Sequence, residues 1–326
     1  MRKIFKWLIY TLLTVLLLCG TVLSLAYFNR DKLLQMVSRE MAQHINGTFG
    51  IGHVDFTFLQ SFPSFSITLH HVYLRGQRYT IYHKDLLNAR KVYLNVNPWA
   101  LLHRQISIHS LTVDNAQIFL FRTKDGYVNT DIFHTSQKSD TSSNEGKGNN
   151  HLQLEKIKFN DVHFTYADSM KGKLVDLRFI KTSNAVNITD STYKVNLAGK
   201  THFNTLTLNT EAGGFLTDRR VILDINAVYN KAAQRLTLLP SVIDANTFRL
   251  RVHGVFDIHK GGSYNLHFDT DKIYVSDGKS VLHRKLNEKL KKINIDKPVA
   301  LNVKIKGFSI AGQQPDVVVN FKSDHA

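Results

Sequence analysis

Three segments of the chain repeat one pattern of apolar and polar residues, and this repeat limits the possible folds more than any other feature. Residues 67–74, 111–118 and 157–164 carry apolar side chains at the same four offsets, and the copies begin 44 and 46 residues apart. The alternation has the period of a strand, but its phase slips by one residue in the middle of each copy. A two-residue hairpin turn or a β-bulge would produce this slip, since both keep the apolar side chains on one face. The spacing is typical of stacked supersecondary units.

The rest of the chain predicts many more strands than helices. Alternating runs continue from residues 51–58 to residues 317–321, with turn-forming residues between them. We therefore expect a mainly β fold after a single N-terminal transmembrane helix. The expected architecture is a curved antiparallel sheet, or groove, of repeated strand pairs with a few short helices.

Two segments have helical spacing instead. Residues 30–46 carry an apolar residue at every fourth position and end at Asn46-Gly47, so they predict a short amphipathic helix. Residues 280–293 predict a basic helix, which either lies on anionic lipid headgroups or caps an open end of the sheet. In the first case, the side chains expected to contact headgroups are Arg284, Lys285, Lys289 and Lys292.

A polar stretch divides the β-rich part of the chain. Residues 135–151 contain no apolar residue, and this composition is typical of a flexible linker. We expect a first β domain over residues 29–134, which begins with the amphipathic helix. A second β-rich segment follows over residues 152–326 and contains the basic helix.

The N-terminal segment is long and apolar enough to cross a bilayer. Residues 7–28 carry no charge, and at about 1.5 Å per residue their helix would match a hydrocarbon core about 30 Å thick. Basic residues precede this run, so residues 1–6 are expected in the cytoplasm and the bulk of the chain across the membrane. A cleaved signal peptide is the main alternative. Its apolar region is usually shorter, and Tyr27 and Phe28 continue the run past the best cleavage site.

Cysteine content and charge exclude several classes of site. The only cysteine, Cys19, lies inside the apolar run, so an intramolecular disulfide and a thiolate metal site are both impossible. Leu18 stands before it, where a lipoprotein signal would have a small residue. The formal net charge is +16, but the basic residues are spread along the chain. This distribution fits anionic lipid headgroups, and we expect no nucleic-acid partner.

No motif for catalysis or cofactor binding is present. The chain has no G-x-S-x-G elbow, Walker loop or H-E-x-x-H helix. The 16 histidines are scattered, and the adjacent pair His70-His71 would point to opposite faces of an extended strand. The closest carboxylates on a shared strand face are Asp269 and Asp271. We therefore expect no catalytic residue, no metal site and no cofactor.

Several short motifs, taken in order, resemble the start of AsmA-family envelope proteins. The likeness is continuous from residue 1 to about residue 133, and residues 246–254 resemble later strands of the family. The motifs are residues 50–54 (GIGHV), 62–67 (FPSFSI), 72–74 (VYL), 92–96 (VYLNV), 98–102 (PWALL), 106–121 and 125–129 (DGYVN). Family members with a complete groove are generally longer than this chain.

This resemblance implies a non-enzymatic protein of the inner membrane, single-pass, with its bulk in the periplasm. It also implies a distant relation to TamB-like and bridge-like lipid-transfer proteins, which are built from repeated β-grooves. The expected role is support of outer-membrane biogenesis by shielding or conducting phospholipid; the alternative is a scaffold or regulator of outer-membrane assembly factors that carries no lipid. The apolar residues of the three repeats are then the candidates for the lipid groove: Ile67, Leu69, Val72, Leu74, Leu111, Val113, Ile118, Ile157, Phe159, Val162 and Phe164.

Overall fold

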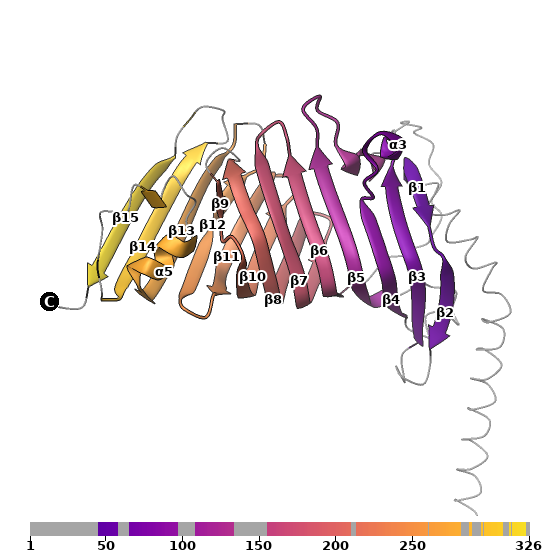
Figure 1. Cartoon of the computed structure of the whole chain (residues 1–326), viewed down its shortest axis with the longest axis horizontal. Coiled ribbons are helices and arrows are strands. Elements are labelled where there is room, and N and C mark those ends of the chain that lie inside the picture. The colour runs from indigo at the N-terminus through magenta and orange to yellow at the C-terminus, as the bar shows by residue number, and fades with distance from the viewer. Residues whose placement is uncertain are drawn as a thin grey trace, which may run out of the picture.

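The chain forms one large curved sheet (Figure 1). The computed structural model describes residues 45–57, 65–96, 108–133, 155–209, 213–259, 261–281, 287–288, 295, 297–308, 313 and 315–323. Within these residues, 15 strands pair in the order β1-β3-β4-β5-β6-β7-β8-β10-β11-β12-β13-β14-β15, while β2 pairs with β3 and β9 with β8. The prediction of a mainly β fold is confirmed.

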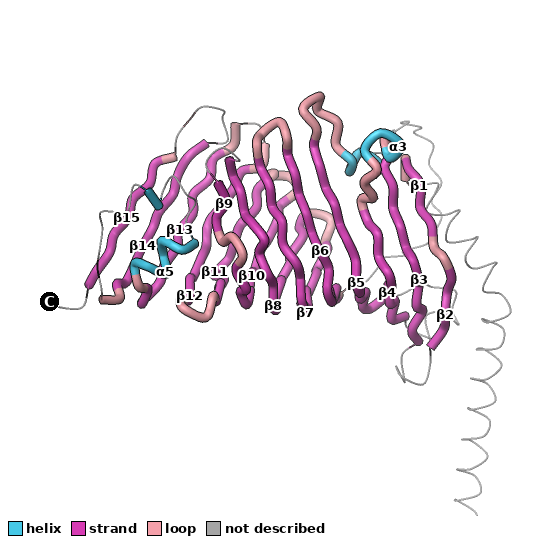
Figure 2. Tube along the Cα trace, in the orientation of Figure 1, coloured by secondary structure: helices cyan, strands magenta, loops and turns pink. Residues whose placement is uncertain are grey.

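Neighbouring strands in the sheet are mostly neighbours in the sequence, and the helices among the described residues are short (Figure 2). The first elements are β1 (Gly47–Gly50), β2 (His53–Thr57), β3 (Phe65–Gly76), α3 (Tyr79–Tyr82), β4 (Leu87–Val96), β5 (Ile108–Arg122), η1 (Asn129–Phe133), β6 (Lys156–Asp168), β7 (Lys173–Ile188) and β8 (Thr192–Asn209). They are followed by β9 (Gly213–Phe215), β10 (Arg219–Asn230), β11 (Arg235–Asp244), β12 (Arg249–Asp257), β13 (Ser263–Ile273), α5 (Val275–Val281), β14 (Val299–Phe308) and β15 (Asp316–Ser323).

Strand direction departs from the prediction at one place. Every pairing among the described strands is antiparallel except that of β5 with β6, which is parallel. Parallel neighbours need a long connection, and the polar stretch 135–151, which lies outside the described residues, stands between these two strands in the sequence. The sheet continues across this pairing from Ser110 and Lys156 to Arg122 and Asp168. The division into two domains stays a prediction about folding units.

The phase slip of the repeat is a bulge inside a strand. Each copy lies within one continuous strand, β3, β5 or β6, so the hairpin alternative is wrong. At the slip, His71, Asn115 and Asp161 have φ angles of 52°, 51° and 53°. Asparagine and aspartate are several-fold enriched in this left-handed region, which explains their place at the centre of two copies.

These irregular residues form a row across five strands, called here the bulge row: His71, Arg90, Asn115, Asp161 and Ile180. Each is skipped in the pairing of its strand with the next, while the residues on either side remain in register. The row ends at β7, where the register with β8 shifts between Phe179 and Lys181. Because each of the five strands skips one residue at this row, the apolar residues on both sides of the bulge row stay aligned from strand to strand.

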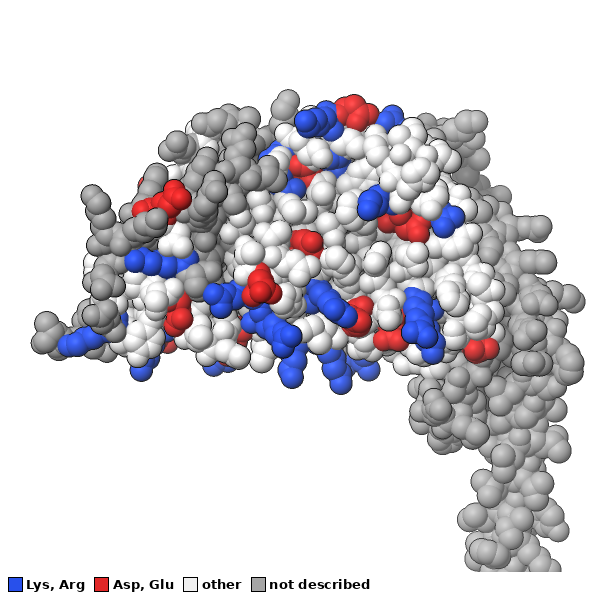
Figure 3. Space-filling view, in the orientation of Figure 1, with Lys and Arg blue, Asp and Glu red and all other residues white. Residues whose placement is uncertain are grey.

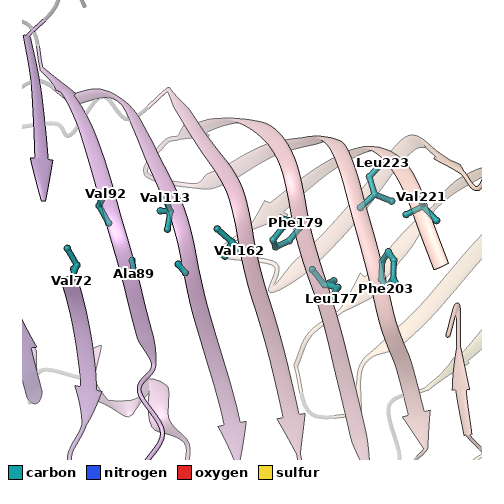
Figure 4. Close-up of a cluster of buried hydrophobic side chains, with 11 residues drawn as sticks. Val72, Ala89, Val92, Val113, Val162, Leu177, Phe179, Phe203, Val221 and Leu223 are labelled. Carbon is teal, nitrogen blue, oxygen red and sulfur yellow. The ribbon is translucent and has the colours of Figure 1, made fainter. Parts of the chain in front are cut away.

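Most of the core is a single layer of side chains on one face of the sheet. The largest cluster extends from β3 to β10, and Figure 4 shows its side chains in a band across these strands. Val162, Ala89 and Val72 in its centre are 0%, 0% and 3% exposed. A smaller cluster around Ile132 packs η1 against β3, and a third joins Phe248, Ile273 and Val299 near α5.

The turn after β5 is fixed by one buried asparagine. Asn129 donates a hydrogen bond to the carbonyl oxygen of Phe119 at 2.6 Å and accepts one from the backbone N–H of Phe121 at 2.9 Å. The side-chain amide of Asn129 therefore forms the hydrogen bonds with the backbone of β5 that a neighbouring strand would otherwise form. This holds η1 and Ile132 beside the start of the sheet, where Asn46 donates to the carbonyl oxygen of Ile132 at 2.7 Å.

The predicted anchor at residues 7–28 and almost all of the amphipathic helix at residues 30–46 lie outside the described residues. In the part of the chain that the structure describes, no helix combines the length and the apolar character needed to span a bilayer.

Candidate functional site

All eleven candidate groove residues lie on one face of the sheet, called here the apolar face. The pairing register arranges them in four rows that run across the strands, because directly paired residues point to the same side. The row of Ile67 consists of Ile67, Leu94, Leu111, Ile157, Asn184, Leu197 and Ile225, and the row of Leu69 consists of Leu69, Val92, Val113, Phe159, Thr182, Gly199 and Leu223. The row of Val72 consists of Val72, Ala89, Ala116, Val162, Phe179, Thr201 and Val221, and the row of Leu74 consists of Leu74, Leu87, Ile118, Phe164, Leu177 and Phe203.

Burial differs between these rows. The row of Val72 is the most buried, and members of the other rows, including Leu69, Leu111, Phe159 and Phe164, are only partly buried and pack against it. The rings of Phe159 and Phe179 lie 5.2 Å apart between centroids. The apolar face is therefore most buried along the row of Val72, where most side chains are small, and larger side chains are partly accessible on both sides of this row.

The residues that complete the rows were missed in the sequence analysis. Leu87, Ala89, Val92 and Leu94 of β4 have the same four offsets as the three repeat copies, and they join the copies of β3 and β5. This pattern is symmetric, so an antiparallel strand presents it in the opposite direction. In β7 the last two positions are occupied by Thr182 and Asn184, so that strand lacked a complete apolar signal.

A polar notch interrupts the apolar face at β7 and β8. Thr182, Asn184 and Thr201 are 3%, 4% and 0% exposed. Asn184 Nδ2 lies 3.4 Å from the Thr182 hydroxyl, but Asn184 Oδ1 and Thr201 Oγ1 have no hydrogen-bond partner among the described residues. Buried polar atoms of this kind normally bind water or a ligand group.

The apolar face continues into the second half of the sheet. Val252, Phe268, Val303 and Val319 form a row from β12 to β15. On the last strand the side chains are open to solvent, and Val319 and Phe321 are 52% and 64% exposed. A shallow hollow of about 250 Å³ lies between β11, β12 and β13 near Pro240 and His253. This hollow is smaller than most pockets that bind small molecules. The candidate site is therefore the extended apolar face and not the hollow.

The opposite face of the sheet, called here the polar face, is built from the alternate residues. One of its rows consists of His70, Lys91, Asp114, Asn160, Lys181 and Lys200. In the view of Figure 3, Lys and Arg gather along the lower edge of the sheet, with Asp and Glu between them. A hydrogen bond from Arg178 lowers the pKa of Asp161, and one from Arg251 lowers the pKa of Asp271.

The carboxylates singled out in the sequence are held by neighbours. Asp271 accepts two hydrogen bonds from Arg251, at 2.5 and 2.6 Å, and Asp269 accepts one from Asn302. A carboxylate whose pKa is lowered by an arginine is a poor proton donor near neutral pH. The carboxylate of Asp271 is therefore held in an ion pair with Arg251.

The candidate headgroup contacts Arg284, Lys285, Lys289 and Lys292 lie outside the described residues, so their role stays a prediction. Of the helical region around them, the structure describes α5 and residues 287–288.

A sequence model described as the AsmA family matches residues 1–210, which is more than half of the chain. No curated protein and no solved structure matches the chain.

Proposed function

Because the chain belongs to the AsmA family, we propose that it supports outer-membrane biogenesis by shielding or conducting phospholipid along its apolar face. The observation that carries this proposal is the alignment of the four rows across β3, β4, β5, β6, β7 and β8, three of which extend to β10. Seven strands spaced about 4.8 Å apart extend about 29 Å, a distance close to the thickness of a hydrocarbon core, about 30 Å.

The energetics favour an acyl chain on this surface. Removing one CH₂ group from water gains about 0.8 kcal/mol, so a phospholipid does not cross an aqueous compartment unaided. The partly exposed side chains of Leu111, Phe159 and Phe164 would cover part of an acyl chain, while the headgroup stays in water. No covalent step is needed.

In this proposal the protein is held in the inner membrane by residues 7–28, with its N-terminus in the cytoplasm and the sheet in the periplasm. The basic side chains of residues 280–293 are proposed to contact lipid headgroups. The start of the sheet at β1, β2 and β3 follows the anchor and the predicted helix at residues 30–46 in the sequence. Lipid would therefore enter the apolar face near this end.

A second candidate function is a scaffold for outer-membrane assembly factors. It is favoured by β15, which pairs only with β14 among the described strands and has exposed side chains at Val317, Val318, Val319 and Phe321. An exposed apolar edge strand is a template for pairing with a strand of another protein.

Site-specific photo-crosslinking separates the two functions. A photoreactive phenylalanine analogue is placed in the full chain at Phe164 or at Thr165, which are adjacent in β6 and face opposite sides of the sheet. We expect phospholipid adducts, identified by mass spectrometry, at position 164 and few at position 165. Equal labelling at the two positions, or none, would contradict lipid binding. A third protein carries the analogue at Val319 on the edge strand β15. Protein adducts formed mainly from this position would favour the scaffold.

A further inference from the structure

Two histidines and an aspartate from different strands meet on the polar face at the first edge of the sheet. Asp55 Oδ2 lies 2.9 Å from His70 Nε2 and 3.8 Å from His53 Nε2, and the three ligand atoms all lie within 4.8 Å of one another. The two imidazole rings stack with their centroids 4.0 Å apart. This is the only group of three potential metal ligands among the residues that the structure describes.

The cluster follows from strand register. His53 of β2 is paired directly with His70 of β3, and Asp55 is two residues further along β2, so all three side chains lie on the same face. Val54 points to the other face, where it is 7% exposed. Gly52 holds β2 close to β3, because its N–H donates to the carbonyl oxygen of His70 at 2.9 Å and a Cβ there would lie 3.1 Å from the Cβ of His71.

We propose that His53, Asp55 and His70 bind one divalent transition-metal ion, for which Zn²⁺ is the best fit. Two neutral imidazoles and one carboxylate are a common zinc ligand set. Zinc bonds of about 2.0–2.1 Å place tetrahedral ligand atoms about 3.3 Å apart, between the two distances measured from Asp55. The exposed ring of His53 needs only a rotation to turn its nitrogen toward the ion, since 55% of its side chain is accessible.

The surroundings leave room for a fourth ligand. Asp55 is 58% exposed, which gives water access to the ion. The centroid of the His71 ring lies 6.2 Å from that of the His53 ring. His71 has a left-handed backbone, with a φ of 52°, and therefore departs from the ordinary alternation of faces along β3. Lys91 of β4 is paired with His70 and disfavours a cation, but Asp114 of β5 lies beside Lys91 in the register and offsets its charge.

The structural consequence is a clamp on an edge strand. In the described part of the sheet, β2 pairs only with β3. An ion held by His53 and Asp55 on one strand and His70 on the other would resist separation of the two strands. Metal binding and folding of this edge are then coupled, and neither depends on lipid binding by the other face.

The test measures zinc binding to the full chain in detergent by equilibrium dialysis with atomic absorption. We expect one zinc ion per chain at micromolar free Zn²⁺, with at least about tenfold weaker binding in His70→Gln, His53→Gln and Asp55→Asn. The matched control is His253→Gln, because His253 and His267 also stack across two strands, at 4.8 Å, but have no third ligand. This control should bind zinc as the wild type does.

A second measurement tests the clamp separately from histidine content. Hydrogen exchange of peptides covering β2 should slow when Zn²⁺ is added to the wild type and to His253→Gln, and should not change in His70→Gln. The proposal would be overturned if the wild type bound no zinc at micromolar concentration. It would also be overturned if all three ligand variants bound zinc as tightly as the wild type, or if zinc left exchange in β2 unchanged.

Discussion

Asn115 of β5 and Asp161 of β6 lie side by side in the sheet, and both have a left-handed backbone, with φ angles of 51° and 53°. The neighbouring pairs, Asp114 with Asn160 and Ala116 with Val162, stay in register. Asn115 and Asp161 therefore occupy equivalent positions in the two strands. The pairs Val113–Phe159 and Ala116–Val162, one on each side of them, keep the apolar rows aligned from β5 to β6.

This conformation leads to the first prediction. Asn115→Val should lower the free energy of unfolding by about 1–2 kcal/mol, because a β-branched residue is strained in the left-handed region. Asn115→Gly should be nearly neutral, since glycine adopts this conformation freely. The Asn115 side chain is exposed, so lost packing contributes little. Urea unfolding of the three proteins would measure the difference, and a valine variant as stable as the wild type would contradict the bulge.

The bulge row shows how far the sequence predicts this fold. The slip in 67–74, 111–118 and 157–164 predicts one apolar face and allows either a hairpin or a bulge, and the continuous strands select the bulge. Periodicity carries no information on strand direction. The parallel pairing of β5 with β6 therefore could not be read from it.

The histidine cluster was not visible in the sequence for a related reason. His53 and His70 are separated by 16 residues, and only the register of β2 with β3 places them opposite each other. The adjacent pair His70-His71 was the more obvious candidate in the sequence. His71 lies in the bulge row, and its φ of 52° removes its side chain from the ordinary alternation of strand faces.

The second prediction concerns the polar notch. Thr201→Val should raise the free energy of unfolding by about 1 kcal/mol, because the Thr201 hydroxyl is fully buried without a partner among the described residues. Valine has nearly the same shape and removes the cost of desolvating the hydroxyl.

A matched control is available on the same strand. Thr207 is also buried, but its hydroxyl lies 3.1 Å from that of Thr205 and shares a hydrogen bond with it. Thr207→Val should therefore lower stability, by about 1 kcal/mol. A loss of stability in Thr201→Val similar to that in Thr207→Val would show that Thr201 has a partner, such as water or lipid.

The third prediction tests lipid binding by charge. Phe164→Lys should reduce the phospholipid that copurifies with the full chain in mild detergent. An acyl chain on the apolar face would remove the lysine charge from water, which is unfavourable. Thr165→Lys places the same charge on the polar face and should leave the phospholipid content unchanged. Mass spectrometry of extracted lipid per chain gives the comparison, and Phe164→Leu controls for the loss of the aromatic ring. Equal phospholipid in all three variants and the wild type would argue against the apolar face as the binding surface.

The fourth prediction is a dependence of stability on pH through His267. Burial lowers the pKa of His267 below 6.5, and the nearby His253, Lys304 and Lys306 act in the same direction, while Asp269 opposes them. Between the lowered pKa and 6.5, the unfolded chain binds a proton at this position more readily than the folded chain does. Stability therefore increases as pH rises through this window and is lost as pH falls.

His267→Gln removes this contribution. We expect the wild type to lose more stability than the variant when the pH is lowered from 7.5 to 5.5, measured as the shift in the urea midpoint. The comparison of the two proteins cancels the titration of histidines distant from His267, and aspartates titrate mainly below this range. The opposite order, a variant that loses more stability than the wild type, would mean that protonated His267 stabilises the folded sheet, through Asp269, more than burial, His253, Lys304 and Lys306 oppose it.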